Sequence, residues 1–292
     1  MSATQTSTLA HPNVVVGLPL GFIRSALFGV SDRHVDPNLQ LKLASAKPVT
    51  LHYRGPALNQ HHALLWQAIL EAHRERCGND PTKVLRISRP ALLRAIGRND
   101  VSTAARKQCN QWLDDLTRAW VSVETPKVRY CGALLGGALL DKETSLLSIC
   151  IPGLLDLFTN EVAHIDLDRK LALGRNQLAM WLHDFISSQS NDPARMIPVP
   201  VAELLRLSAS SLKLPQFRQR LKQAIELLKV GKDGASPLLI SATIDAADRL
   251  VFQKSRTFTL ILGGKAEERV QATNARDRRV QEVLESRGRV AL

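Results

Sequence analysis

One order of secondary-structure elements is predicted twice along the chain: helix, strand, helix, turn, helix and β-hairpin. In the first copy, apolar periodicity and turn residues place these elements at 60–76, 84–87, 88–97 and 103–120, and in two β-rich runs, 121–140 and 145–151. In the second copy, about 110 residues further on, they fall at 176–187, 196–199, 201–207, 215–229, 238–244 and 250–253. This is the order of a winged helix. The sequence therefore predicts an α+β, helix-rich fold with tandem winged-helix (helix-turn-helix) domains.

The repeat divides the 292 residues into four predicted parts. Residues 1–46 are expected to be a flexible N-terminal segment and linker, and 263–292 a flexible, charged C-terminal tail. Residues 47–160 form the first predicted winged-helix domain, and 161–262 form the second, the main DNA-reading domain. Within the first part, the apolar, glycine-punctuated run 17–30 is more typical of a docking segment than of a free tail.

The helix predicted over 215–229 has one apolar face. Phe217, Leu221, Ala224 and Leu228 recur at helical spacing, which predicts a buried stripe. The opposite face carries cations and amides and few acids. Arginine, lysine and glutamine are the side chains that reach phosphates and the major-groove edges of bases.

The segment around this helix is strongly basic. Between Arg206 and Lys232 there are seven Lys or Arg residues and one acid, Glu226. A solvated helix face usually mixes both signs of charge, whereas a surface that docks on a polyanion does not. The segment is therefore more typical of a nucleic-acid contact than of a plain solvated face.

Candidate DNA contacts come from corresponding places in the two copies. In the second copy they are Lys213, Gln216, Arg218, Gln219, Lys222 and Gln223. In the first copy they are Arg98, Thr103, Arg106, Lys107, Asn110 and Gln111. Contacts from the hairpins, the wings of the fold, are expected from Lys127, Arg129, Lys254 and Arg256. Any single arginine is expected to contact a phosphate more often than a base.

The overall charge agrees with a polyanionic partner. The formal net charge is +12 at pH 7, which indicates nucleic acid or an anionic membrane surface. The longest apolar run, 132–140, is too short to span a bilayer, and the N-terminus is not a convincing signal peptide. The expected location is therefore the cytoplasm. The four cysteines form no CxxC pair, so no metal site is expected, and the sequence gives no sign of a cofactor.

Enzyme classes find little support in the sequence. No P-loop GxxxxGK[ST] is present, which argues against nucleotide hydrolysis. A DNA-nicking enzyme needs a nucleophilic tyrosine, and Tyr53 and Tyr130 both lie in predicted strands. His61 and His62 are adjacent on a predicted helix and diverge by about 100°, which suits shared metal ligation badly. The protein is therefore not expected to be an enzyme.

The chain resembles the TrfA family of plasmid replication initiators in pattern and order over residues 20–255. The matching stretches are RSALF (Arg24 to Phe28), VTLHYRGPAL with HHALLWQAILEAHR (Val49 to Arg74), RPALLRAIG, QWLDDL, LALGRNQLAMWLHDFISSQ and LPQFRQRLKQAIELL. The resemblance implies two winged-helix domains that bind directly repeated origin sequences, called iterons. It also implies opening of adjacent AT-rich DNA and recruitment of the host initiator, the replicative helicase and the sliding clamp.

The resemblance further implies that members bind DNA as monomers and form homodimers in solution. The family has a glutamine-led clamp-binding peptide near its first domain, and Gln40, Leu41 and Leu43 lie at a plausible place for it. Ala44 stands where an aromatic residue is expected, and the alternative is a plain linker.

A second class of function stays open, a winged-helix transcriptional regulator that binds a palindromic operator. Such a regulator normally has one winged helix per chain and a dimerisation or ligand-binding domain. Two copies in one chain suit an asymmetric, directly repeated site, which favours the initiator. A partition protein is a weaker possibility.

Overall fold

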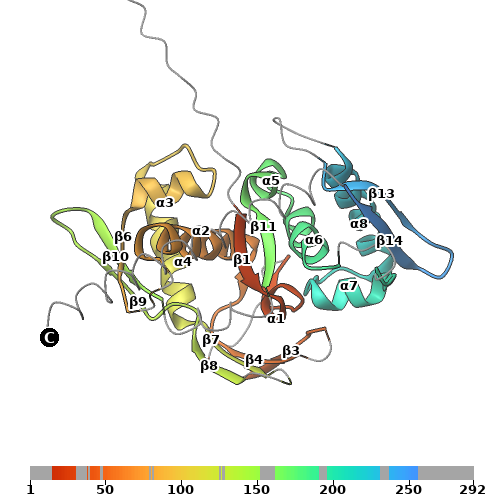
Figure 1. Ribbon diagram of the computed structural model, residues 1–292, viewed down its shortest axis with the longest axis horizontal. Helices are drawn as coiled ribbons and strands as arrows, with labels where there is room; N and C mark the ends of the chain where they lie inside the picture. Colours follow the sequence, from red (N-terminus) through yellow and green to blue (C-terminus); the bar gives the residue numbers. More distant parts are fainter. Residues whose placement is uncertain are drawn as a thin grey trace, which may run out of the picture.

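The computed structural model describes residues 15–30, 38, 40–46, 49–78, 80, 82–124, 126, 129–151, 162–190, 196–230 and 237–255. Over these residues the fold is a mixture of helices and several small sheets (Figure 1). The predicted contacts Lys127 and Arg256 and the tail 263–292 lie outside the described residues.

The first copy of the repeat contains the predicted helices, but only the last part of its β-rich run 121–140 joins the sheet of this copy. Its elements are α2 (Gln60–Cys77), β6 (Leu85–Ser88), α3 (Arg89–Ala95), α4 (Thr103–Arg118), β9 (Gly137–Leu140) and β10 (Leu146–Cys150). The three strands form one antiparallel sheet in the order β6-β10-β9. The strand that precedes the helix pair therefore pairs with the last strand of the hairpin.

The second copy has the same strand order. Its elements are α6 (Gln177–Ser187), β12 (Val199–Pro200), α7 (Val201–Leu207), α8 (Leu214–Lys229), β13 (Leu239–Ile244) and β14 (Arg249–Lys254). The sheet order is β12-β14-β13, so β12 pairs with the last strand as β6 does. The strand predicted over 196–199 is reduced to the two residues of β12.

Local sequence explains where several of these helices begin. Asn59 forms a capping box with His62 at the start of α2. Ser88, Ser102 and Asn176 each accept a backbone N–H three residues on, at the starts of α3, α4 and α6. The side-chain oxygens thus satisfy N–H groups that have no partner within the helix.

A four-stranded sheet lies outside both copies. It consists of β3 (Leu41–Leu43), β4 (Thr50–Arg54), β7 (Trp120–Glu124) and β8 (Arg129–Ala133), in that order. The expectation of a flexible linker within 1–46 is therefore wrong for β3, which pairs with β4. The Leu-Lys-Leu alternation explains the strand, because Leu43 packs against the core while Lys42 is exposed.

The N-terminal segment joins the two copies. Its elements are β1 (Val15–Pro19), α1 (Leu20–Ile23) and β2 (Phe28–Gly29). β1 pairs with β11 (Val162–Asp166), which leads through α5 (Leu167–Ala172) into the second copy. β2 pairs with β5 (Leu58–Asn59), which leads into α2 of the first. Figure 1 shows β1 and β11 in the middle of the molecule, with the hairpins β9–β10 and β13–β14 towards opposite ends.

The core runs through both copies and the N-terminal segment. Trp66 of α2 is buried, with its ring 5.6 Å from the rings of Phe22 and Phe28, measured between centroids. Trp112 and Trp181 are also buried in the core. The run 17–30 is thus packed as a docking segment rather than a free tail over its described residues.

Candidate nucleic-acid interface

The apolar face of α8 is buried as predicted. Phe217, Leu221, Ala224 and Leu228 are fully buried, and α8 packs against α6, α7 and β13. Burial of this face leaves the opposite face in solvent. The exposed residues there include Gln216, Gln219, Arg220, Lys222 and Gln223. Lys213, the N-cap residue, is exposed as well.

Arg220 is a cation that the predicted contacts leave out. Its side chain is exposed, and its Nη1 atom makes a long hydrogen bond of 3.4 Å to Oε1 of Gln223. Arg220 is already one of the seven Lys or Arg residues counted between Arg206 and Lys232. Its place beside Lys222 and Gln219 on the exposed face is the reason to add it.

Arg218 is held within the protein. Its Nε and Nη2 atoms donate to the two carboxylate oxygens of Asp248, each at 2.8 Å. This hydrogen-bonded pair raises the pKa of Arg218 and lowers the pKa of Asp248. Asp248 lies in the turn between β13 and β14 and has a left-handed backbone, with φ of 56°. The pair therefore fastens the second hairpin to α8, and the Asp248 carboxylate compensates the charge of Arg218.

The two ends of α8 differ in charge. At its N-terminus no side chain caps the helix, and the first turn carries no acid. At its C-terminus, the buried guanidinium of Arg169 donates to the carbonyl oxygens of Leu228 at 3.2 Å and Val230 at 2.7 Å. Glu226 and Lys229 form an ion pair there at 2.8 Å. An anion is therefore favoured at the N-terminal half of α8, where N–H groups and exposed cations coincide.

The corresponding helix of the first copy, α4, exposes Thr103, Arg106, Lys107 and Gln111, as predicted. Asn110 is half-buried, and Gln111 donates to Oδ1 of Asp115 at 3.1 Å. The amide of Gln111, one of the predicted DNA contacts, is thus already hydrogen-bonded within the helix.

Arg98 precedes α4 and is partly held by its neighbours. Its guanidinium carbon lies 4.6 Å from the centre of the Trp112 ring, in cation–π contact. Its Nη1 atom donates to Oε1 of Gln108 at 3.0 Å. These contacts place Arg98 against the middle of α4.

Two predicted hairpin contacts lie elsewhere. Arg129 is exposed, but it belongs to β8 of the four-stranded sheet and not to the β9–β10 hairpin. Lys254 is buried, and its ammonium group donates to the carbonyl oxygens of Ser187 at 3.3 Å and Gln189 at 2.6 Å. Burial lowers the pKa of Lys254 to about 8. We therefore leave both residues out of the hairpin surface.

The predicted clamp-binding residues lie along the edge of the four-stranded sheet. Gln40 is exposed, while Leu41 and Leu43 are half-buried opposite Tyr53 and Leu51 of β4. A partner that binds this peptide as an isolated extended segment would require β3 to leave the sheet.

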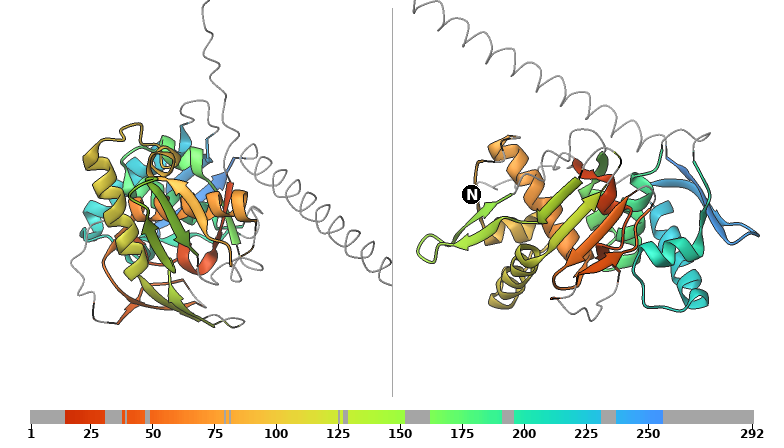
Figure 2. Two further views of the ribbon diagram at one scale, coloured as in Figure 1. Left: turned by 90° about the vertical axis from the view of Figure 1, so that its left-hand side faces the viewer. Right: turned by 90° about the horizontal axis from the view of Figure 1, so that it is seen from below.

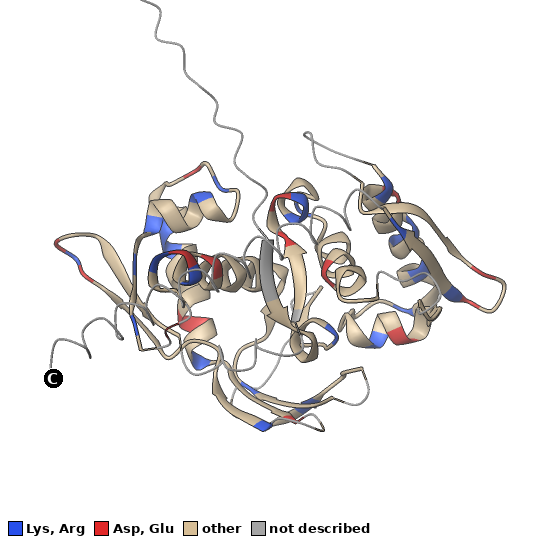
Figure 3. Cartoon of the chain, viewed as in Figure 1, with Lys and Arg blue, Asp and Glu red and all other residues tan. Residues whose placement is uncertain are grey.

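The two candidate reading helices share one side of the molecule. In both views of Figure 2, α4 and the α7–α8 pair lie towards the same edge, the left in one view and the bottom in the other. Figure 3 shows Lys and Arg along α8 and around α3, next to α4. Two helices that expose cations thus lie towards the same edge of the molecule.

Two features, a group of metal ligands and a membrane-spanning helix, are absent from the part of the chain described. No group of three or more His, Cys, Asp or Glu residues there could hold a metal ion. None of the helices in the described ranges has the length and apolar character needed to cross a membrane.

No protein-family model and no curated protein matches the chain. The solved structures that are similar in three dimensions include two of RctB. A selenomethionine crystal structure of domain 2 and domain 3 of RctB has a TM-score of 0.48 and 12% identity, over 73% of this chain and 86% of that chain. A second structure of RctB domains 2–3 has a TM-score of 0.45 and 10% identity, over 80% and 98%. At these values neither similarity establishes the family or the function of this chain.

Proposed function

We propose that this protein is a non-enzymatic DNA-binding replication initiator whose two copies are winged-helix domains that together bind one directly repeated origin sequence. The observation that carries the proposal is the exposed N-terminal half of α8, which combines cations and amides with a helix N-terminus. The surface is built for phosphates and base edges together.

The strand pairing supports the winged-helix interpretation. In both copies a short strand precedes the helix pair and joins the sheet of the following hairpin. This pairing fixes the hairpin beside the second helix of the pair, where a wing can follow the DNA backbone. The second helix is then the one that enters the major groove.

Roles can be assigned to side chains of α8. Gln216, Gln219 and Gln223 present amides, which pair with adenine in the major groove. Lys213, Arg220 and Lys222 supply cations for phosphates on either side. In α4, Thr103, Arg106 and Lys107 have the corresponding roles. Arg98, which lies over the ring of Trp112, is a further candidate for a phosphate contact.

Two reading helices on one side of a single chain favour a direct repeat over a palindrome. A palindrome is read by two chains related by a two-fold axis, each contributing the same helix. Here one chain offers two different helices, so it reads an asymmetric sequence. The alternative, a dimeric transcriptional regulator, needs a symmetric pair of chains on one operator.

The proposal extends to further steps of initiation by the family resemblance. These are opening of AT-rich DNA beside the repeats, recruitment of the host initiator, helicase and sliding clamp, and a homodimer in solution that is inactive. Cytoplasmic location and the clamp contact through Gln40, Leu41 and Leu43 belong to the same proposal.

A footprint of the purified protein on DNA flanking its own gene tests the function. Evenly spaced protections in one orientation, separated by about two helical turns, are expected for direct repeats. A single symmetric protection over a promoter would support the dimeric regulator and exclude the initiator. An Arg220→Ala, Lys222→Ala variant is the control, since it should lose the part of each protection that α8 contributes while remaining folded.

A further inference from the structure

The two copies meet at a seam of buried polar side chains. Lys170 of α5, with no exposed surface, forms an ion pair with Asp184 of α6. Gln67 of α2, in the first copy, joins this pair with both ends of its amide. Its Oε1 atom accepts from Lys170 at 3.1 Å, and its Nε2 atom donates to Oδ2 of Asp184 at 3.0 Å.

The charge state of the seam depends on these contacts. Burial opposes ionisation of Asp184, but the ammonium group of Lys170 and a contact with His183 hold the pKa of this carboxyl below its usual value. Buried charges are stable only when hydrogen bonds satisfy them in a specific geometry. A rotation of one copy against the other would separate Gln67 from both charges.

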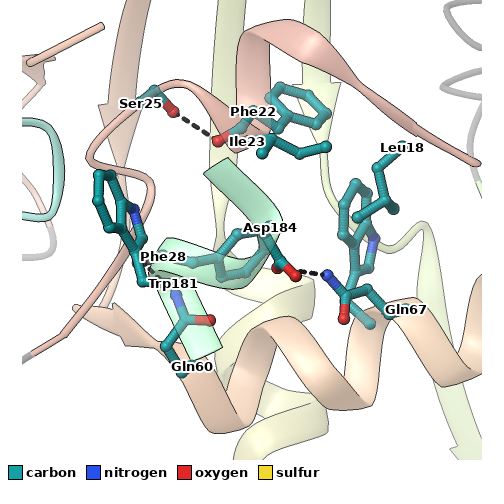
Figure 4. A pocket seen from close by; sticks show the side chains of 10 residues that line it. Leu18, Phe22, Ile23, Ser25, Phe28, Gln60, Gln67, Trp181 and Asp184 are labelled. Carbon is teal, nitrogen blue, oxygen red and sulfur yellow. Dashed lines mark hydrogen bonds between the residues drawn. The ribbon is translucent and has the colours of Figure 1, made fainter. Parts of the chain in front are cut away.

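The N-terminal segment closes the same seam. Figure 4 shows Phe22, Ile23 and Leu18 beside a small cavity, with the Gln67–Asp184 hydrogen bond at its edge. Arg24 donates through Nε to Oγ of Ser188 at 3.0 Å, at the C-terminal end of α6. The backbone N–H of Val30 donates to the carbonyl oxygen of Ser208 at 3.0 Å.

We infer that this seam holds α4 and α8 at one fixed separation, and that Gln67 is the positioning residue that restricts the protein to DNA repeats in which the two contacted blocks have one spacing. The inference rests on the proposed function. A rigid connection loses binding when the spacing changes, because both helices cannot then reach their grooves together. A flexible connection tolerates several spacings.

The first test measures the separation in the free protein. Spin labels are placed on Asp114→Cys in α4 and Leu227→Cys in α8, both exposed positions, in a chain with Cys131→Ser and Cys150→Ser. Pulsed electron paramagnetic resonance should give one narrow distribution of distances between the two labels when Gln67 is present. In Gln67→Met, which keeps the side-chain volume and removes both hydrogen bonds, the distribution should broaden or split. A narrow, unchanged distribution in a folded Gln67→Met would overturn the inference.

The second test selects bound duplexes from a random DNA library. The unlabelled wild-type chain should return two sequence blocks at one separation, and Gln67→Met should return the same blocks at several separations. The control is Glu75→Met, an exposed position on the same helix, which should behave as wild type. If Gln67→Met does not fold, Gln67→Asn is used in its place. Its shorter side chain withdraws the amide from Lys170 and Asp184.

The outcomes separate the two proposals. A wild-type chain that selects no DNA contradicts the proposed function, while the distance measurement still reports whether the seam is rigid. A broadened distance together with an unchanged single spacing contradicts the role of Gln67 in spacing and leaves DNA binding intact.

Discussion

The two candidate reading helices occupy the same place in the repeat but differ in how their charges are compensated. Around α8, Lys213, Arg220 and Lys222 are exposed. Asp248, the acid that faces this helix from the hairpin, forms an ion pair with Arg218. On α4, Gln111 is bound by Asp115, and Arg98 lies over Trp112. Topology alone therefore does not decide how strongly each copy binds. We expect the second copy to supply most of the DNA affinity and the first copy to fix where the protein sits along the DNA sequence.

The largest expected effect is a difference in DNA affinity between variants of α8 and variants of α4. Lys213→Ala, Arg220→Ala and Lys222→Ala together should weaken binding by about 100-fold at physiological salt, because three phosphate contacts are lost. Arg106→Ala with Lys107→Ala in α4 should weaken it by about tenfold. Fluorescence anisotropy on a duplex from the protected region, over a salt series, measures both. Equal losses in the two variants would remove the distinction between the copies.

The second effect concerns the lysine that ties β14 to α6 in the second copy. Since burial lowers the pKa of Lys254 to about 8, the folded protein binds fewer protons than the unfolded chain between about pH 8 and 10. The free energy of unfolding should rise with pH there, approaching about 1.4 kcal/mol per pH unit from this group. Below pH 8 the penalty of the buried charge is fully present.

Denaturant titrations of wild type and Lys254→Met across this pH range isolate that contribution. The difference in unfolding free energy between the two proteins should shift in favour of wild type as the pH rises. A difference that stays constant from pH 7 to about 10 would show that Lys254 is not buried as a charged group.

The next effect compares how the two helices begin. Ser102 caps α4 through the N–H of Ala105, at 3.3 Å, whereas no side chain caps α8 at Lys213. Ser102→Ala should destabilise the protein by about 1 kcal/mol. Thermal unfolding followed by circular dichroism measures the change. Ser102→Thr is the control, because its hydroxyl can keep both the cap and the hydrogen bond that Ser102 donates to Asp100 at 2.9 Å. A loss of similar size in Ser102→Thr would mean that capping is not the cause.

The smallest effect tests the ion pair between α8 and the second hairpin. If Asp248 neutralises Arg218, then Asp248→Asn should tighten binding to random-sequence DNA by about threefold, since one cation is released. Arg218→Gln should change affinity less than Lys222→Ala does. An affinity loss in Arg218→Gln that equals the loss in Lys222→Ala would instead identify Arg218 as a direct contact, as the sequence predicts.

Much of the repeat follows from local sequence signals. The stripe of Phe217, Leu221 and Leu228 predicts α8 closely, because helical periodicity is a short-range effect. The pairing of β1 with β11 joins residues about 150 apart, and no short-range pattern specifies it. The same holds for the seam of Gln67, Lys170 and Asp184, which only the folded chain brings together.

The candidate site is likewise predicted only in part by the sequence. The sequence identifies which residues of α8 are exposed, because its apolar stripe fixes the buried face. It does not reveal that Arg218 is bound by Asp248, thirty positions away, or that Lys254 turns inward to cap α6. Side-chain partners across elements depend on tertiary packing, so cations that look equivalent in sequence differ in availability.

The most direct test of the central claim is a hydroxyl-radical footprint on one repeat, made with wild type and with each helix variant. The account predicts two protected blocks per repeat and one chain per repeat. The variant in α8 should lose one block, and the Arg106→Ala, Lys107→Ala variant should lose the other. Loss of the same block in both variants, or a symmetric footprint that needs two chains, would contradict the claim that one chain reads one repeat with two different helices.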